Sequence, residues 1–344
     1  MPSNMIVRAL GTALALQVSM TCAAKAADVV VTSYGGLWEK ATRECFVKEF
    51  EKRTGKTAEV VLGNATQWIN QIAANPAKPP VDVMVNNIDE VLDANRRGIV
   101  EPFDIKNVPR LPELEPALVA VGYGNGATVA YSSMGIAYNT KTVKHPPKSW
   151  KEFVDGTMKG EWQAAIPDIN YVSTLGHTLW LFANVYGGGV KDFDPGFKTI
   201  RDMYKSKNLQ FWSDPNAFLN LLKTGDIDIG MYWEGRTLAF KDQGNPDIAF
   251  INPLPGAVVN TAVVQKVKNG SPLGWEFIDV MMSPEPQACF GNIMQYRVSN
   301  TKARMKPEIE AKLTKMETIL LPPYEQIVPQ NAALVERWNK EIKR

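Results

Sequence analysis

Aromatic rings, amides and small residues gather at the ends of the strands that the sequence predicts. In chain order these ends read Ser33-Tyr34-Gly35-Gly36, Gly63-Asn64, Asn86-Asn87, Asp168 and Trp233-Glu234. Ligands of open α/β sheets bind beyond the carboxyl ends of the strands. Because most of these residues are rings, amides and glycines, the pattern favours a recognition surface over a catalytic one.

The sequence lacks the short motifs that mark common catalytic and cofactor sites. It contains no G-x-S-x-G, H-E-x-x-H, G-x-x-x-x-G-K-[ST] or paired C-x-x-C. Two histidines are present, His145 and His177, and His177 lies among Leu175, Leu179 and Trp180, where a buried core histidine is expected. We therefore expect no enzyme activity, no metal site and no cofactor.

Length and composition are those of a globular protein with two domains or one large one. The chain has 344 residues, 45% apolar and 22% charged, which excludes a disordered or coiled-coil chain. Its 38 Lys and Arg residues against 36 Asp and Glu residues give a formal net charge of +2. Nucleic-acid-binding proteins usually carry a basic excess or basic clusters, so we expect no nucleic-acid partner.

Residues 1–26 have the pattern of a secretory signal peptide. Arg8 precedes an apolar stretch over residues 9–16, and Ala24-Lys25-Ala26 is a small-x-small cleavage pattern. We expect cleavage after Ala26 and a mature chain in the periplasm. Two alternatives stay open: a buried N-terminal helix, and a lipid anchor on Cys22, whose preceding residues lack the usual lipidation pattern.

Strand and helix patterns alternate along the chain, which indicates an α/β fold. A first unit has strands at 28–32, 57–62 and 81–85 and helices at 37–55, 68–72 and 88–97. A second unit has strands at 128–139, 164–166 and 227–232 and helices beginning at 149, 173, 194 and 215. A third piece has a strand at 262–267, helices at 272–282 and 284–294, and a largely helical tail. Two α/β units joined by extended strands predict two lobes with a cleft between them.

Short segments with a characteristic order and spacing run along nearly the whole mature chain. They are Ser33-Tyr34-Gly35-Gly36, Phe50-Glu51-Lys52-Arg53-Thr54-Gly55, Val81-Asp82-Val83-Met84, Met134-Gly135-Ile136-Ala137-Tyr138-Asn139, Pro147-Lys148-Ser149-Trp150, Lys159-Gly160, Gly225-Asp226-Ile227-Asp228-Ile229-Gly230, Trp233-Glu234-Gly235, Ser283-Pro284-Glu285-Pro286-Gln287-Ala288 and Tyr296-Arg297-Val298-Ser299-Asn300. In this order they resemble the periplasmic solute-binding proteins of ABC importers, in the branch with polyamine (spermidine and putrescine), thiamine and γ-aminobutyrate binders.

This resemblance implies a two-lobed periplasmic-binding-protein fold of type II, with crossover strands near residues 128–133 and 253–259. Residues 27–130 and 258–305 would form lobe 1, and residues 131–257 and 306–344 would form lobe 2. The implied function is the capture of a small cationic or zwitterionic nitrogenous solute. The implied partner is the ABC permease at the inner membrane, to which a monomer would deliver the solute.

The resemblance also implies a ligand site between the lobes. In the polyamine binders, aromatic rings enclose the methylene chain and carboxylates hold the ammonium ends. Of three family carboxylates Asp168 remains, whereas the other two positions fall near Tyr171 and Thr261. The matching rings are Tyr34, Trp233 and Tyr296.

Because two family carboxylates are missing, a ligand with one cationic and one anionic end fits better than a polyamine. Asp168 or Glu234 would hold the cationic end, and Arg236 or Arg297 would clamp a carboxylate or phosphate. Further candidate ligand-binding residues at the strand ends and crossovers are Asn64, Asn86, Ser132 and Ser133.

Two cysteines follow the signal segment, Cys45 and Cys289. Both would lie in lobe 1 of the implied fold, and an exported compartment favours oxidation, so a disulfide between them is expected. Two separate buried thiols are the alternative.

Two other functions stay open beside solute import. The fold also suits an exported enzyme or transferase, and a sensor subunit that presents its ligand to a membrane receptor.

Overall fold

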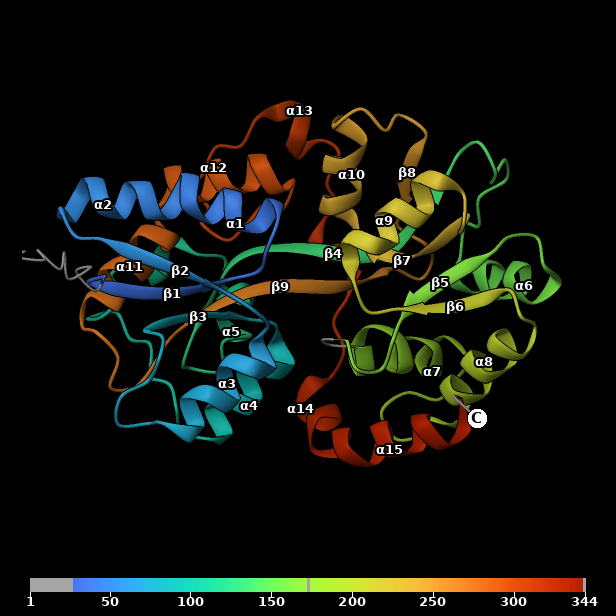
Figure 1. Ribbon diagram of the computed structural model, residues 1–344, viewed down its shortest axis with the longest axis horizontal. Coiled ribbons are helices and arrows are strands. Elements are labelled where there is room, and N and C mark those ends of the chain that lie inside the picture. The colour runs from blue at the N-terminus through green and yellow to red at the C-terminus, as the bar shows by residue number, and fades with distance from the viewer. Residues whose placement is uncertain (1–26, 172–173, 343–344) are drawn as a thin grey trace, which may run out of the picture.

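The computed structural model describes residues 27–171 and 174–342, so the predicted signal peptide lies outside the described residues. These residues form a two-lobed α/β fold around one mixed sheet, which confirms the expected fold class (Figure 1). The main strand order is β2-β1-β3-β9-β4-β7-β5-β6. The strands are β1 (Val29–Ser33), β2 (Ala58–Leu62), β3 (Val83–Asn86), β4 (Ala127–Asn139), β5 (Ala164–Pro167), β6 (Leu209–Trp212), β7 (Ile229–Trp233), β8 (Ile248–Ile251), β9 (Ala257–Lys266), β10 (Arg297–Val298) and β11 (Ile319–Leu320).

Helices cover both faces of this sheet (Figure 1). In the first lobe they are α1 (Leu37–Ala41), η1 (Thr42–Val47), α2 (Lys48–Thr54), α3 (Ala65–Ala74), α4 (Ile88–Arg96), η2 (Leu111–Glu113), α5 (Pro116–Ala120), α11 (Leu273–Met282) and α12 (Pro284–Met294). The remaining helices are α6 (Trp150–Lys159), η3 (Leu175–Trp180), α7 (Leu181–Val185), α8 (Asp194–Lys205), α9 (Pro215–Thr224), α10 (Glu234–Asp242), α13 (Pro307–Glu310), η4 (Met316–Thr318), α14 (Tyr324–Ile327), η5 (Val328–Gln330) and α15 (Asn331–Glu341). No helix within residues 27–171 and 174–342 is both long and apolar enough to cross a bilayer.

Each lobe has its own hydrophobic core. The β1 core, named for its first strand, includes Val31, Phe50 and Phe290. The β7 core includes Phe197 and Met231 on the other side of the molecule. Parallel strands with helices on both faces are buried on both sides, which explains why their sequences are nearly continuous apolar runs.

The long strands β4 and β9 pass through both lobes and pair antiparallel with each other. They lie near the crossover segments expected from the sequence. Parallel pairing is found within each lobe, where β1 pairs with β2 and β3, and β5 pairs with β6 and β7. The exact lobe boundaries stay a prediction.

The element predictions differ from the structure where short strands pair locally. Strands β6 and β8 were not expected, and β9 begins at Ala257, earlier than the predicted start at 262. The helix expected over 37–55 is continuous, but its middle turn, η1, is π-helical. The tail is only partly helical: α14 packs between α4 and η3, and α15 packs on α8.

A disulfide joins Cys45 of η1 to Cys289 of α12, with Cα atoms 5.7 Å apart. The bond expected from the implied fold is therefore present in the structure. It ties together two helices that are 244 residues apart in sequence and that both contribute to the β1 core.

Candidate ligand-binding site

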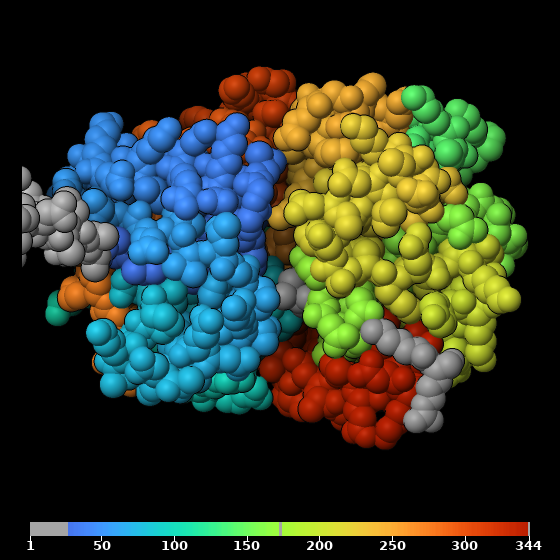
Figure 2. Space-filling model, viewed as in Figure 1, coloured from blue at the N-terminus to red at the C-terminus, as the bar shows by residue number. Residues whose placement is uncertain are grey.

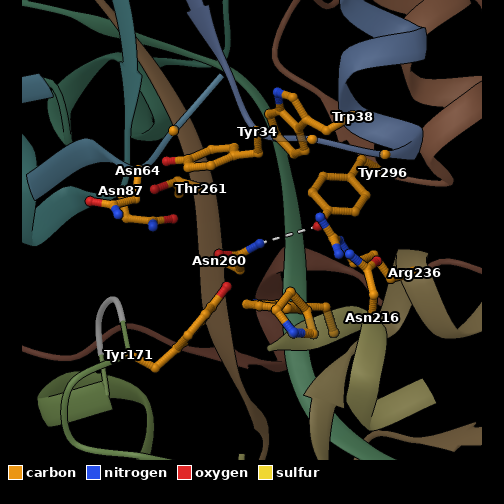
Figure 3. Close-up of a pocket in the computed structure, with 15 residues that line it drawn as sticks. Tyr34, Trp38, Asn64, Asn87, Tyr171, Asn216, Arg236, Asn260, Thr261 and Tyr296 are labelled. Atoms are coloured by element: carbon orange, nitrogen blue, oxygen red, sulfur yellow. Dashed lines mark hydrogen bonds between the residues drawn. The ribbon is translucent and has the colours of Figure 1, made fainter. Parts of the chain in front are cut away.

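A pocket of about 260 Å³ lies between the two lobes, at the carboxyl ends of the strands. Figure 2 shows the groove that separates the half formed by the blue and cyan segments from the half formed by the yellow and green ones. The lining residues come from both halves and from β9, and Figure 3 shows how they surround the cavity. They are Tyr34, Gly35, Gly36, Trp38, Gly63, Asn64, Asn87, Tyr171, Pro215, Asn216, Trp233, Arg236, Asn260, Thr261 and Tyr296.

The first lobe supplies an aromatic wall. Tyr34 follows β1, and its ring contacts Trp38 at 5.4 Å and Trp68 at 5.5 Å between centroids. Its hydroxyl donates a hydrogen bond to the Val85 carbonyl, 3.2 Å away. Gly36 has φ +71°, a conformation that favours glycine, and this turn brings Trp38 back to the pocket at the start of α1. Burial raises the pKa of the Tyr34 phenol well above its usual value, so the ring is neutral.

Two amides of the first lobe line the pocket beside Tyr34, and each of them directly precedes a helix (Figure 3). The Asn64 side chain accepts a hydrogen bond from the Gln67 backbone N–H at 2.9 Å and so caps α3. Asn87 precedes α4, and its own backbone N–H donates to the Glu90 carboxylate at 3.0 Å. Both helices therefore begin at the cavity.

The second lobe supplies Trp233 at the end of β7. Its side chain is buried, and ring contacts to Tyr171, Trp212 and Tyr232 have centroid distances of 5.6, 5.5 and 5.1 Å. Trp233 is thus a wall of the pocket and at the same time a part of the β7 core. The sequence predicted Trp233 as a residue of the cleft, and the structure shows that it also packs in the β7 core.

Arg236 carries the only formal charge among the described residues that line the pocket. It stands one turn after Trp233, and its guanidinium carbon lies 5.4 Å from the centre of the Trp233 ring. Within residues 27–171 and 174–342, no ion pair of Arg236 with a carboxylate is present. Burial raises the pKa values of the nearby Tyr171 and Tyr296 phenols, so these rings do not supply the missing negative charge.

Strand β9 forms the back of the pocket with Asn260 and Thr261. The Asn260 side-chain amide donates to the Tyr296 hydroxyl at 3.3 Å, the dashed line in Figure 3. The hydroxyl of Thr261 and the indole N–H of Trp233 are buried and lack a hydrogen-bond partner in the described chain. Buried polar groups are normally paired, so these two atoms are suited to contact a bound molecule.

Seven residues proposed from the sequence meet at this pocket, and six do not. The seven are Tyr34, Asn64, Tyr171, Trp233, Arg236, Thr261 and Tyr296. Asn86 lies outside the lining, because its amide is buried and donates to Gln265 at 2.7 Å. Successive strand residues point to opposite faces, which places its neighbour Asn87 at the cavity instead.

Three of the other five residues make hydrogen bonds in segments that border the pocket. Ser132 accepts a hydrogen bond from the Gly235 N–H at 3.3 Å, and Ser133 donates to Glu234 at 3.4 Å. Asp168 accepts from the backbone N–H of Asn170 at 3.0 Å.

The Glu234 carboxylate also accepts a hydrogen bond from the backbone N–H of Thr314 at 2.8 Å. Arg297, the alternative anion clamp, donates to the backbone carbonyl groups of Glu310, Leu313 and Thr314. Both side chains therefore engage the C-terminal segment and lie outside the pocket lining.

Several lining residues escaped the sequence predictions, namely Trp38, Pro215, Asn216 and Asn260, and Asn87 was noted only as part of a strand end. Pro215 and Asn216 begin α9 just after β6, so the strand-end rule would have found them if β6 had been recognised. Asn260 lies inside β9, where no strand end marks it.

Comparisons with known proteins agree with this architecture. The profile of the family "bacterial extracellular solute-binding protein" matches residues 46–318. A crystal structure of a proposed extracellular solute-binding protein from Bordetella parapertussis is 28% identical, with a TM-score of 0.77, covering 91% of this chain and 98% of the other. A GABA receptor structure is 20% identical, with a TM-score of 0.76, covering 90% of this chain and 96% of the other.

A third structure is the periplasmic binding protein AfuA from Actinobacillus pleuropneumoniae with fructose 6-phosphate bound. It is 19% identical, with a TM-score of 0.74, and the match covers 92% of this chain and 98% of the other. Because the family profile spans most of the chain, the protein belongs to the bacterial extracellular solute-binding proteins.

Proposed function

We propose that this protein captures a small zwitterionic solute in the periplasm and delivers it as a monomer to the permease of an ABC importer. The acidic group of the solute binds Arg236, and its nitrogen-bearing end lies among the aromatic rings. The observation that carries the proposal is the Arg236 guanidinium, which lines a pocket whose other described lining residues are uncharged. A carboxylate, phosphate or phosphonate is the group that a guanidinium binds best, with two parallel hydrogen bonds.

The same charge distribution argues against polyamines and thiamine among the solutes considered. A polyamine would bring several ammonium groups into a pocket whose described lining has no carboxylate. A buried cation without a counter-ion is strongly disfavoured, and a cation next to Arg236 adds repulsion. One ammonium group can instead rest on the faces of Tyr34, Tyr171 or Trp233.

Ligands named for related proteins have the chemistry that this proposal requires. GABA and fructose 6-phosphate are the ligands of the two neighbours described above, and both carry an acidic group. A Salmonella typhimurium protein proposed to bind 2-aminoethylphosphonate is 23% identical over 118 residues, covering 34% of this chain and 33% of its own. Two of these three ligands are ω-amino acids in the broad sense, with an amine at one end and an acid at the other.

A binding panel tests the proposal. Thermal shift and calorimetry would compare 4-aminobutyrate and 2-aminoethylphosphonate with butylamine, which lacks the acid, and with putrescine, spermidine and thiamine. We expect one-to-one binding of at least one zwitterion, no binding of butylamine, and recovery of the zwitterion unchanged. Binding of spermidine or thiamine without either zwitterion would overturn the ligand class, and turnover of a bound compound would favour the exported-enzyme alternative.

The export step has a separate test. Mass spectrometry of the periplasmic protein should give Ala27 as the first residue. Exported protein with Met1 at its terminus, or with a lipid on Cys22, would contradict the proposed cleavage.

A further inference from the structure

Residues 306–318, here called the strap, run across the outside of the junction between the lobes. The strap includes α13 and η4 and connects the end of the α12 region with β11 (Figure 1). The Lys306 backbone N–H donates to the Asn292 side chain of α12 at 2.9 Å. At the other end, the Asn252 side chain donates to Thr318 at 3.2 Å. The strap is thus attached to segments of both lobes.

Arg297 holds the strap from the first lobe. It belongs to β10, which pairs with β4. Its guanidinium donates to the carbonyl groups of Leu313 and Thr314 at 2.8 and 2.9 Å, and to that of Glu310 at 3.2 Å. Three carbonyl groups on one guanidinium orient this part of the backbone closely.

Glu234 holds the same strap from the second lobe. Its side chain is almost fully buried, with 3% of the residue exposed. One carboxylate oxygen accepts both the backbone N–H and the hydroxyl of Thr314, at 2.8 and 2.5 Å. Its other oxygen accepts from Ser133 of β4 at 3.4 Å. Thr314 therefore connects the Arg297 and Glu234 side chains through its own backbone.

The position of Glu234 makes this link relevant to the pocket. It is the first residue of α10, directly after Trp233 and two residues before Arg236, and both neighbours line the cavity. Gly235 is also fixed, because its N–H donates to Ser132 and the Tyr296 ring leaves no room for a Cβ at this position. The first turn of α10 thus sits between the strap, β4 and Tyr296.

We propose that Glu234 is a positioning residue, which locks the first turn of α10 to the strap and thereby holds Arg236 in the place where it receives the acidic group of the solute. This role rests on the proposed function for its effect on binding. The structural part of the proposal is that the contact between Glu234 and Thr314 keeps the strap and the first turn of α10 ordered. This part does not depend on the identity of the solute.

The test compares Glu234→Gln, Thr314→Val and the double variant with Lys312→Ala as a matched control. Lys312 lies on the same strap, but its ion pair with Asp242, at 3.3 Å, is exposed. Amide hydrogen–deuterium exchange rates without ligand measure how well residues 306–318 and 234–240 are ordered. Calorimetry with 4-aminobutyrate and 2-aminoethylphosphonate reads the dissociation constant, at a temperature where every variant is folded.

We expect exchange in both segments to rise roughly tenfold in Glu234→Gln and Thr314→Val, about the effect of one lost charge-assisted hydrogen bond. The dissociation constant should rise by a similar factor in both. The effects of the two substitutions should be less than additive in the double variant, because both weaken the same link between Glu234 and Thr314. Lys312→Ala should leave exchange and affinity unchanged.

Unchanged exchange in both single variants overturns the link itself. Faster exchange with an unchanged dissociation constant overturns the positioning role and leaves the link purely structural. If neither compound binds the unmodified protein, the proposed function fails, and exchange at residues 234–240 then decides the positioning role alone. If exchange rises in the strap but not in residues 234–240 of α10, the positioning role of Glu234 is overturned.

Discussion

Arg236 is a charged side chain in a wall of neutral groups, and its guanidinium has no carboxylate partner within the described parts of the chain. Such a group is desolvated on one side and retains unused hydrogen-bond donors. A bound acid would restore the hydrogen bonds that burial removes. Under the proposed function, binding of the acidic group would therefore offset the cost of burying Arg236 in the unliganded protein.

Replacing Arg236 by Gln should weaken the binding of a zwitterion tenfold to a hundredfold. The reason is the loss of charge-assisted hydrogen bonds worth about 1.5–3 kcal/mol. Calorimetry with 4-aminobutyrate or 2-aminoethylphosphonate measures this change. Arg304→Gln is the control, since Arg304 is exposed and donates to carbonyl groups of its own turn. Equal affinity of Arg236→Gln and the unmodified protein would remove Arg236 from the site.

His177 makes stability depend on pH. Its Nε2 lies 2.9 Å from the Val259 carbonyl, so this nitrogen donates, and burial lowers the pKa of His177 from 6.5 to about 4. Above pH 6.5 the ring is neutral in both the folded and the unfolded state. Between pH 6.5 and 4 only the unfolded state binds the proton, so the free energy of unfolding falls as the pH falls.

This contribution should reach about 2–3 kcal/mol at pH 4.5, at about 1.36 kcal/mol per pKa unit. Urea unfolding of the unmodified protein and of His177→Gln at pH 7.5 and pH 4.5 isolates it. The stability advantage of the unmodified protein over the variant should shrink by that amount at the lower pH. A constant difference between the two proteins would show that His177 is not protonated on unfolding in this range.

At the level of single residues, the sequence could predict the rings better than the amides. Tyr34 directly follows the buried strand β1 and Trp233 is the last residue of β7, so the strand-end rule found both. The choice between Asn86 and Asn87 depends on a single residue of register, and the alternation of side chains along β3 decides it. The sequence could not predict that Arg236 lacks a carboxylate partner, because this depends on the position of every carboxylate in the folded chain.

Helix α10 packs so closely on α12 that the contact leaves room only for hydrogen at position 235. A Cβ on Gly235 would lie 2.4 Å from the Tyr296 ring and 2.5 Å from the Gln295 carbonyl oxygen. The ring can tilt, whereas the backbone oxygen cannot move without shifting the end of α12. The two elements are therefore held in one relative position.

Gly235→Ala should lower the free energy of unfolding by about 1–3 kcal/mol, the usual cost of overpacking. Alanine normally stabilises a helix relative to glycine by up to about 1 kcal/mol, and the clash outweighs this gain. Urea unfolding measures the difference, with Gly35→Ala as the control, because a Cβ at position 35 meets nothing within 4 Å. An unchanged or higher stability of Gly235→Ala would mean that α10 and α12 move apart easily.

At the scale of elements, the long amphipathic helices and buried strands were predictable from their periodicity. The strap was not, because its short helices have little pattern of their own and its backbone is held by side chains from elsewhere. Arg297 illustrates the difficulty: an arginine beside the pocket residue Tyr296 is a reasonable anion clamp, yet its guanidinium donates to backbone carbonyl groups. Sequence alone does not distinguish these two uses.

In the described parts of the chain the β1 core and the β7 core lie on one sheet, and β4 and β9 contribute to both. Ala127 and Ala130 of β4 belong to the β1 core, whereas Met134 and Ile136 belong to the β7 core. Losing one core would leave half of each long strand without its packing. The lobes should therefore unfold together, although each has a core of its own.

Equilibrium unfolding in urea should accordingly give one transition, with coincident tryptophan fluorescence and circular dichroism curves. A bound solute should shift the urea midpoint upward without splitting the transition. At a concentration of 100 times its dissociation constant, the solute should raise the free energy of unfolding by about 2.7 kcal/mol. Two separated transitions would show that the lobes are independent folding units.

The fold class was predictable at this scale because the strand–helix alternation and the family segments extend along nearly the whole chain. The pairing of β4 with β9 joins segments more than a hundred residues apart, and the sequence showed only that both are extended.

The disulfide between Cys45 and Cys289 also makes residues 45–289 a closed covalent loop that includes β4, most of the pocket lining and the whole of β9. A protease that cuts once inside this loop, for example at the exposed surface around Ile105, does not release a fragment. The two pieces stay joined through sulfur, run as one band in denaturing electrophoresis, and separate only after reduction. A single backbone cut in this region therefore leaves the molecular mass almost unchanged until the disulfide is opened.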